Sequence, residues 1–491
     1  MDAFFDAFLG PQGENGAWFR KLVDKVLTWQ MKWRESRFPE DSSVYFGHEP
    51  ASAFRRKLEE ALDTFLSRMD GNIPFPSPRY VGQMLKDPGV PALLGYLATM
   101  MINPNNHAYE GGPVTTEMEM EVVEQLKRMV GMAQGWGHLT SGGTLANMEA
   151  LWAVRDTLPR GKVVFSSGSH YSWKRICSIL GVHDWAELPV DRQYRMDLAA
   201  LEDVLRRERV ALVVANFGTT GTGSVDPLPE ILDLRNRYGF HLHVDAAYGG
   251  YLRSALLDEN GVLLPAEDTV TYVKADVRAA AEHLGEADSM TIDPHKHGLV
   301  MYGAGGVLYR EEKFRQTILN TAPYTYHVKE KPNIGMFTLE GSRPGAAAAA
   351  VWLTHKVLPL NVAGLGQILR ETLSTAREFA TRLAVETQWE PLADPDLDIV
   401  CFHPKDAAAN PNAANHRALA LYRSLSVENP EAPFILSKFV VDPHTARKFL
   451  GTSQPPEEGW NTLRAVFIKH WMRLGPKPTY LDRLLQEVAR V

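Results

Sequence analysis

The sequence predicts an α/β protein whose larger domain holds a mainly parallel β-sheet with helices on both faces. From about residue 138, short continuous apolar runs alternate with amphipathic helical stretches. Strands that are buried on both faces have this uninterrupted apolar character. Beyond about residue 345 the pattern changes to helices and a few β-like runs, which indicates a smaller α+β domain.

The strands of the large sheet are predicted at residues 163–165, 210–214, 241–244 and 306–309, with a further apolar strand that starts at Ser289. Helices are predicted between them, at residues 198–205 and 228–234. In the smaller domain, β-like runs are expected at residues 398–402 and 434–441. Ligands bind beyond the carboxyl ends of parallel strands, so the polar turns after these strands are the places to search.

The first 70 residues are predicted to be helical, because apolar side chains recur there at helical spacing. The two stripes are Trp18, Leu22, Val26 and Trp29, and Phe54, Leu58, Leu62 and Phe65. Such an arm must bury its apolar surface, and a partner subunit is one way to do so. We therefore expect three parts: a helical segment with substrate-side loops at 1–105, a large domain at 106–355 and a small domain at 356–491.

Composition excludes several classes of protein. The chain has 491 residues and a net charge of −7, and it lacks a run of lysine or arginine, so nucleic acid is not an expected partner. No apolar run approaches the roughly 20 residues that span a bilayer, and the N-terminus lacks the pattern of a signal peptide. Cys177 and Cys401 match no metal or redox spacing and suit a reducing compartment. We expect a cytoplasmic protein without a metal site.

Two irregular stretches, at residues 75–84 and 103–113, interrupt the N-terminal half. Long, polar, glycine-rich connections in a compact protein are often functional loops, although a simple linker is an equal alternative. After the second stretch, Thr116 and Glu119 have the spacing of a capping box, which predicts that a helix begins there.

Three polar turns carry groups that suit one ligand. Gly142, Gly143 and Thr144 open a helix, where free N–H groups attract an anion such as a phosphate. Asp245 directly follows a buried strand, where a carboxylate is costly unless it meets a cation or a strong donor. Residues 216–224 end another strand with hydroxyls and glycines, and His170 follows a third strand.

Lys296 lies in a polar turn after the strand at Ser289 and, taken alone, would be an ordinary surface lysine. Together the three turns and this amine suit a ligand with an anionic group, a cationic ring nitrogen near Asp245 and an aldehyde near Lys296. Pyridoxal 5′-phosphate (PLP) has these parts, since PLP enzymes use a lysine Schiff base and an acidic partner for the ring nitrogen.

These motifs resemble those of the group II PLP-dependent decarboxylases, the family that contains glutamate, cysteine sulfinate and aromatic amino acid decarboxylases. The resemblance covers about residues 70–360 and rests on motifs in the family order: Gly142-Gly143-Thr144, His170, Gly218-Thr219-Thr220, His243 to Tyr248, and Asp293-Pro294-His295-Lys296. It implies the aspartate-aminotransferase fold (fold type I) and a homodimer with its sites at the subunit interface. The implied activity is decarboxylation of an L-amino acid to an amine.

The resemblance also implies a role for each matching residue. Lys296 would form the internal aldimine, Asp245 would keep the ring nitrogen protonated, and His170 would stack on the ring. Other cofactor contacts are implied for Gly143, Thr144, Thr220, Ala247 and His295. In this family the proton donor is often a tyrosine on a mobile loop, for which Tyr324 and Tyr326 are candidates, with His327 as a third.

The substrate stays open from the sequence. Residues 77–84 resemble a glutamate-type motif in which Gln83 matches a substrate-contacting position, and the loop around Tyr109 resembles that branch too. An acidic substrate requires a cationic partner, for which Arg343 is a candidate. Two alternative activities are a carbon–carbon lyase resembling sphingosine phosphate lyase and a decarboxylase that forms an aldehyde.

Overall fold

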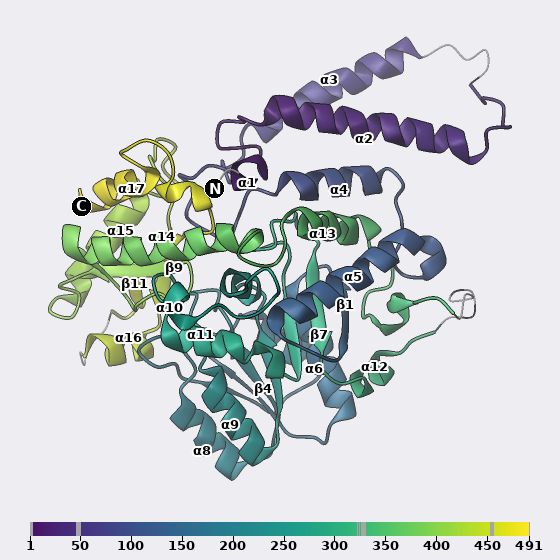
Figure 1. Ribbon diagram of the computed structural model, residues 1–491. Helices are drawn as coiled ribbons and strands as arrows, with labels where there is room; N and C mark the ends of the chain where they lie inside the picture. Colours follow the sequence, from purple (N-terminus) through teal and green to yellow (C-terminus); the bar gives the residue numbers. More distant parts are fainter. Residues whose placement is uncertain are drawn as a thin grey trace.

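The computed structural model describes residues 3–45, 51–321, 323, 325, 330–451 and 456–490. The chain forms a large α/β unit, a smaller unit built on a second sheet, and an N-terminal helical arm (Figure 1). Of the described helices, none is both long and apolar enough to cross a membrane.

The large sheet contains the strand order β1-β7-β6-β5-β4-β2-β3. β7 runs antiparallel to both of its neighbours, whereas the other neighbouring strands are parallel. The prediction of a mainly parallel sheet is therefore confirmed, and the aspartate-aminotransferase type of fold with it. The strands are β1 (Trp136–Thr140), β2 (Lys162–Ser166), β3 (Trp185–Leu188), β4 (Val210–Asn216), β5 (His241–Asp245), β6 (Ser289–Ile292) and β7 (Gly305–Tyr309).

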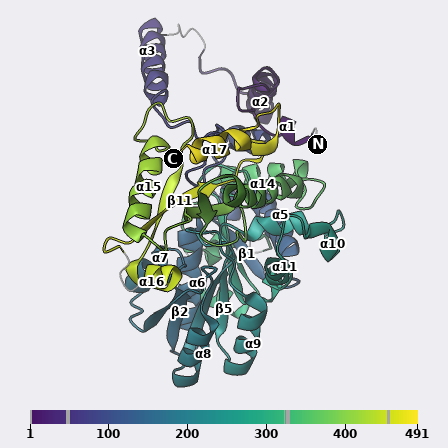
Figure 2. The same cartoon turned by 90° about the vertical axis from the view of Figure 1, so that its left-hand side faces the viewer.

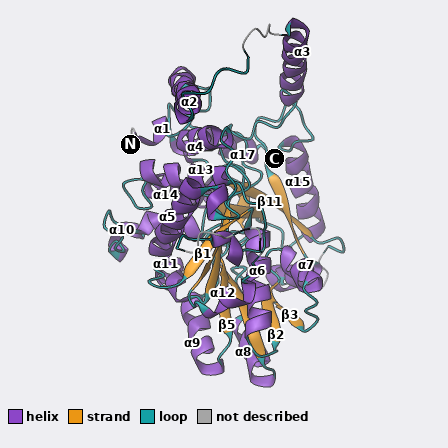
Figure 3. Ribbon diagram, turned by 90° about the vertical axis from the view of Figure 1, so that its right-hand side faces the viewer, coloured by secondary structure: helices purple, strands orange, loops and turns teal. Residues whose placement is uncertain are grey.

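Helices cover both faces of this sheet, and in Figure 3 the strands lie between them. One face packs a core against the first set of helices, α6 (Gly143–Thr157), α7 (Ser172–Ile179) and α12 (Lys313–Ile318). The other face packs against the second set, α5 (Pro113–Val130), α8 (Leu198–Arg207), α9 (Leu228–Tyr238), α11 (Ala275–Glu282) and α13 (Gly345–Val357). A short helix, α10 (Ala266–Thr269), precedes α11.

The small sheet has the order β10-β11-β9-β8, with every pair antiparallel. Its apolar core is formed with α14, α15 and α17. Its elements are β8 (Trp389–Pro391), β9 (Ile399–Pro404), β10 (Ser437–Val441), β11 (Trp460–Val466), α14 (Leu365–Glu386), α15 (Pro411–Ser424), α16 (Pro443–Leu450) and α17 (Tyr480–Ala489). The 3-10 helices of the chain are η1 (Tyr109–Gly111), η2 (Gly250–Leu256), η3 (Leu284–Glu286), η4 (Ile334–Phe337) and η5 (His470–Arg473).

The N-terminal arm consists of α1 (Ala3–Asp6), α2 (Gly16–Arg37), α3 (Ser52–Met69) and α4 (Val90–Met100). α4 packs on α13 of the large unit, and α2 lies against α4. α3 stands away from the other described elements in Figures 2 and 3. The predicted helical character of this segment is thus observed, and α3 leaves an apolar stripe without cover in the single chain.

The predicted capping box at Thr116 is wrong. α5 begins three residues earlier, at Pro113, because proline suits the first turn of a helix, and Thr116 lies inside it. Glu119 is instead buried, where its carboxylate accepts hydrogen bonds from Asn106 and from the Leu139 N–H and pairs with Arg343. Burial raises the pKa of Glu119, but the Arg343 guanidinium and the hydrogen bonds from Asn106 and Leu139 together hold that pKa below its usual value.

Candidate active site

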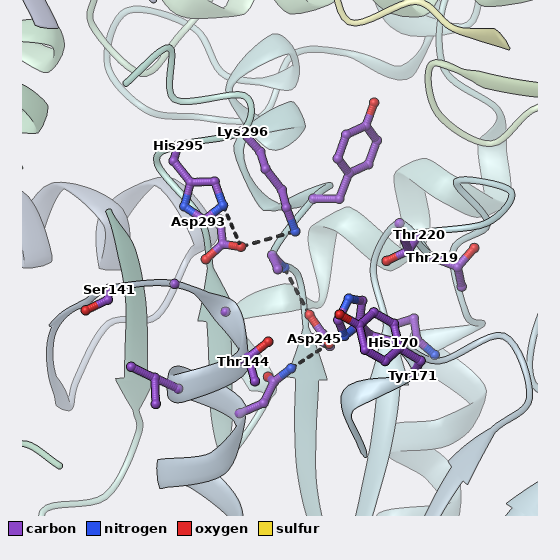
Figure 4. Close-up of a pocket in the computed structure, with 18 residues that line it drawn as sticks. Ser141, Thr144, His170, Tyr171, Thr219, Thr220, Asp245, Asp293, His295 and Lys296 are labelled. Atoms are coloured by element: carbon purple, nitrogen blue, oxygen red, sulfur yellow. Dashed lines mark hydrogen bonds and ion pairs between the residues drawn. The ribbon is translucent and has the colours of Figure 1, made fainter. Parts of the chain in front are cut away.

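The turns that follow strands β1, β2, β4, β5 and β6 meet around one cavity of about 370 Å³ (Figure 4). This volume lies within the range of small-molecule sites, which is roughly 300–1,000 Å³. The parallel strands all end at this edge of the sheet, so groups far apart in the chain come together here. At the end of β4 the chain turns through Gly218, whose φ of +98° favours glycine.

Lys296 lies in the turn after β6 and its amine points into the cavity (Figure 4). Its Nζ is 3.1 Å from Oδ2 of Asp293, a carboxylate that is almost fully buried. The same oxygen lies 3.5 Å from Nε2 of His295. The Nδ1 of His295 is 2.7 Å from the carbonyl of Ala304, which orients the ring. The lysine is thus held by its own turn rather than extended into solvent.

Asp245 ends β5 on the opposite side of the cavity, and its side chain is buried. Its Oδ2 accepts a hydrogen bond of 2.8 Å from Nδ2 of Asn147 and a longer one of 3.4 Å from Nε1 of Trp173. Among the described residues, its Oδ1 accepts a single hydrogen bond, of 3.3 Å, from the N–H of Ala247. In the part of the chain that the structure describes, no cation forms an ion pair with this carboxylate. Oδ1 is therefore the oxygen available to a cationic ligand.

His170 follows β2 and lines the same cavity beside Tyr171. Its Nδ1 is 2.7 Å from the hydroxyl of Ser172, and its ring centroid is 4.3 Å from that of Tyr171. Burial lowers the pKa of His170, although Asp245 acts in the opposite direction. A neutral imidazole therefore faces the cavity at neutral pH.

The start of helix α6 supplies the groups that suit an anion. The N–H groups of Gly143 and Thr144 belong to the first turn, where no intrahelical acceptor is available. A Cβ on Gly143 would lie 2.8 Å from Oδ2 of Asp293, so only glycine leaves the cavity open at this point. The preceding turn is held by Ser141, whose N–H and hydroxyl both donate to Glu340.

These residues fit PLP. The cavity offers anion donors at the start of α6, a primary amine at Lys296 and a buried carboxylate that lacks a cationic partner at Asp245. A phosphate, an aldehyde and a protonated ring nitrogen are complementary to these three groups. The fit rests on the buried Asp245 oxygen above all, because a carboxylate in such a place is costly without a cation.

The small unit contacts the cavity through Asp398. The hydroxyl of Tyr248 donates to Oδ1 of Asp398 at 2.6 Å, and His297 lies 3.4 Å from Oδ2 of the same carboxylate. Burial raises the pKa of Asp398, but His297 and Tyr248 outweigh burial and keep that pKa below its usual value. Tyr248 lines the cavity, and His297 follows Lys296 in the same turn. Their contacts with Asp398, the residue that precedes β9, therefore connect the small unit to the cavity and to the lysine turn.

Arg464 on β11 joins two loops near the cavity. Its guanidinium donates to the carbonyls of Thr220 and Gly221 at 2.8 Å and to that of Gly82 at 2.9 Å. Burial lowers the pKa of Arg464, which is surrounded by carbonyls rather than by a carboxylate partner. All three bonds hold loop backbone in place.

The structure brings together one group of the predicted residues. Those that line the cavity are Gly143, Thr144, His170, Thr220, Asp245, Ala247, His295 and Lys296. The proton-donor candidates Tyr324, Tyr326 and His327 lie outside the described residues.

The three predicted substrate residues do not line this cavity. Gln83 accepts a hydrogen bond of 3.1 Å from Arg464, and the hydroxyl of Tyr109 donates to Glu117 at 2.9 Å. The guanidinium of Arg343 is occupied by Glu119 and by the carbonyls of Leu139 and Asn106. A substrate carboxylate would have to break this buried pair, so the geometry indicates a structural role for Arg343.

Several residues of the site had no predicted role. Asn147 and Trp173 hold Asp245, and Asp293 holds Lys296. The spacing in the sequence contained a signal for one of them: Asn147 lies four residues after Gly143, which places it one helical turn further along α6. The contacts of Trp173 and Asp398 join distant segments, and no local pattern indicates them.

Comparison with known proteins agrees with this geometry. The family model described as the pyridoxal-dependent decarboxylase conserved domain matches residues 73–405. The chain is 34% identical to an L-tyrosine decarboxylase of Enterococcus faecium over 80% of each chain. It is 32% identical to an L-aspartate decarboxylase of Thermococcus kodakarensis over 70% of this chain and 84% of that one. Its fold is similar to that in a crystal structure of mouse CSAD, with a TM-score of 0.71, 21% identity and coverage of 93% and 91% of the two chains.

Substitution of Gly143 tests whether the start of α6 receives the phosphate. We expect Gly143→Ala to weaken PLP binding by about tenfold or more, because the added methyl group crowds Asp293 and fills the anion site. Titration of the apoprotein with PLP, followed by absorbance, measures the affinity. Gly16→Ala is the matched control, since a Cβ there meets nothing within 4 Å. Equal PLP affinity in the two variants would contradict the assignment.

Proposed function

The chain belongs to the pyridoxal-dependent decarboxylase family, and we propose that it decarboxylates an aromatic L-amino acid to the corresponding amine. The activity, PLP-dependent decarboxylation of an amino acid, belongs to the family. The substrate class and the roles of single residues are our proposals, and the first of these rests on the side chains that line the cavity.

When bound, PLP supplies an aldehyde for the amino group of the substrate and a ring that accepts the electron pair left behind by CO2. We propose that the N–H groups at the start of α6 and the hydroxyl of Thr144 bind the phosphate. Asp245 would keep the ring nitrogen protonated through Oδ1, and His170 would cover one face of the ring. Thr220, Ala247 and His295 would complete the cofactor site.

Lys296 is proposed as the amine that bonds to the cofactor and yields to the substrate. Its position beside Asp293 and His295 supports this role, because both can hold the proton that the amine must lose before it attacks a carbonyl. Tyr324 or Tyr326 stays the proposed donor of the proton to the substrate Cα.

A second cavity, of about 680 Å³, adjoins the cofactor site and shares His170, Tyr171, Thr219 and Thr220 with it. Phe439 and Tyr194 line it, with ring centroids 5.5 Å apart. Among the described residues that line either cavity, none is an arginine and Lys296 is the one lysine. Carboxylates of Glu187 and Asp442 are present instead. Glu187 is paired with Lys174 at 2.8 Å, so an acidic side chain would meet like charge at Asp442, whereas an aromatic side chain would meet rings.

The relatives support the same choice in part. Both L-tyrosine and L-aspartate decarboxylases resemble the chain, and the lining described above favours a substrate of the first kind. L-Tyrosine is therefore the candidate that we place first.

Turnover of a panel of L-amino acids tests the substrate class. We expect kcat/KM for L-tyrosine to exceed that for L-aspartate at least about a hundredfold, since a buried side-chain carboxylate without a cation costs several kcal/mol. The products should be CO2 and tyramine, which also separates this activity from the aldehyde-forming variant. A preference for L-aspartate would overturn the proposal.

A matched pair of variants locates the side chain of the substrate. Phe439→Ala should lower kcat/KM for L-tyrosine about tenfold by removing an aromatic contact. Phe449→Ala, whose ring lies 4.9 Å from Tyr194 but does not line the cavity, should leave it unchanged.

We further propose that the chain forms a homodimer through α3. Its exposed apolar side chains are Phe54, Leu58, Leu62, Phe65, Leu66 and Met69, each at least 49% exposed. Six such side chains on one face of a projecting helix form an apolar patch that a soluble monomer rarely leaves in water. The resemblance described above implies a second copy as the partner.

We expect Leu62→Glu to weaken the dimer at least about tenfold, because association would bury a carboxylate without a partner. Ser67→Glu places the same charge on the opposite face of α3 and should leave the dimer intact. Analytical ultracentrifugation of both variants measures the effect. A dimer of unchanged strength in Leu62→Glu would exclude this face.

We also propose a cytoplasmic location and a division of the chain into three parts, at residues 105 and 355. A cytoplasmic location is supported by Cys177 and Cys401, which are free and buried thiols. The division at residues 105 and 355 is supported by the two sheets, which fall into separate ranges.

A further inference from the structure

Strand β5 carries polar side chains at alternate positions, all on the face toward α6. His241, His243 and Asp245 alternate with Leu242 and Val244, which pack into the core of the opposite face. All three polar side chains are buried. Burying two imidazoles behind a carboxylate is costly unless each nitrogen has a partner, so their contacts need an explanation.

These side chains belong to a continuous set of hydrogen bonds that we call the buried polar row. It consists of His241, Ser289, His243, Asn147 and Asp245. His241 Nε2 and His243 Nδ1 each lie 2.8 Å from the hydroxyl of Ser289. The other nitrogen of His243, Nε2, lies 3.0 Å from Oδ1 of Asn147.

The direction of every bond follows from its last member. A carboxylate only accepts, so Asn147 presents its amide nitrogen to Asp245 and its oxygen to His243. The Nε2 of His243 must then carry the proton. Since a neutral imidazole carries one proton, Nδ1 is an acceptor, and the Ser289 hydroxyl donates to it. The Ser289 oxygen in turn accepts from Nε2 of His241.

Both imidazoles are neutral, which this direction requires. Burial lowers the pKa of His243 to about 4 and moves the pKa of His241 well below its usual value. Lys313, Arg310 and Arg235 lie near His241, and their positive charges lower its pKa further. Thr291, whose hydroxyl lies 3.4 Å from His243 Nε2, is a second, weaker neighbour. With both rings neutral, the row has one consistent arrangement of protons.

We propose that the buried polar row positions the Asp245 carboxylate for the ring nitrogen of the cofactor. The row holds Oδ2 through Asn147 and leaves Oδ1 toward the cavity. His241, His243 and Ser289 do not line the cavity, so they are positioning residues, whereas Asn147 both lines the cavity and donates to Asp245. This inference rests on the proposed role of Asp245 and adds to it the residues that set its orientation.

The consequence is specific for Ser289, whose hydroxyl lies 2.8 Å from a nitrogen of each histidine, whereas the hydrogen bonds to Asp245 within the described chain come from Asn147, Trp173 and Ala247. Without its hydroxyl, Nδ1 of His243 loses its donor and the imidazole can take the other tautomer. The Asn147 amide can then turn its oxygen toward Asp245, where it repels the carboxylate. Loss of the Ser289 hydroxyl should therefore weaken the contact between Asp245 and the ring nitrogen of PLP.

The test uses three full-length variants and PLP as the probe. Ser289→Ala breaks the row at its middle, and Asn147→Ala removes the direct donor to Asp245. Ser254→Ala is the matched control, because Ser254 is as fully buried as Ser289 but its hydroxyl has no hydrogen-bond partner among the described residues. Thermal melting of the apoproteins shows whether each variant folds.

We expect Ser289→Ala to weaken PLP binding by about two- to tenfold, the worth of one hydrogen bond, and Asn147→Ala by about tenfold or more. The ¹⁵N chemical shift of PLP labelled at its ring nitrogen should move toward the unprotonated value in both variants. Neither measurement should change in Ser254→Ala. A general loss of core stability would not move the ¹⁵N shift.

The outcomes distinguish a failure of the proposed function from a failure of the positioning role. If the unaltered protein does not bind PLP, the proposed function itself fails. If it binds PLP but Ser289→Ala and Asn147→Ala match Ser254→Ala in affinity and ¹⁵N shift, the positioning role of the row is overturned. If Ser289→Ala does not fold, Asn147→Ala decides by the same two measurements.

Discussion

The buried carboxylate of Asp245 is the constraint on which the site depends. A charge taken out of water requires partners, and the described protein supplies only neutral donors to one of its oxygens. The carboxylate lines a cavity that also holds the amine of Lys296. A cofactor with a protonated ring nitrogen and an aldehyde can pair with the Asp245 carboxylate and bond to the Lys296 amine at the same time. The neutral side chains behind Asp245 can then be understood as its support.

The topology of the large sheet brings Asp245 and Lys296 together. β4, β5 and β6 are parallel neighbours, so their carboxyl ends deliver Thr220, Asp245 and Lys296 to one edge of the sheet. The small unit then fixes this edge through Asp398, which binds both Tyr248 and His297, and through Arg464, which binds two loops. The active site is therefore a property of both units rather than of the large sheet alone.

Much of this arrangement was predictable from the sequence, because it depends on local patterns. Apolar runs indicated β4, β5 and β6, and polar turns after strands indicated Asp245 and Lys296. The start of α5 was misplaced, since the Thr116 and Glu119 spacing imitates a cap while Glu119 is used by Arg343 across the fold. The proposed substrate contacts were not predictable, because the second cavity is lined by segments more than 200 residues apart, such as Tyr171 and Phe439. Such contacts depend on tertiary packing and leave no periodic signal.

In the proposed site Lys296, and no other lysine, bonds to the cofactor that Asp245 orients. Borohydride reduction of the PLP-loaded protein, followed by digestion and mass spectrometry of the peptides, identifies the lysine that bonds to PLP. We expect a stable pyridoxyl group on the peptide that contains Lys296, and no such adduct after Lys296→Ala. A pyridoxyl group on a different lysine, or none on a protein that binds PLP, would contradict it.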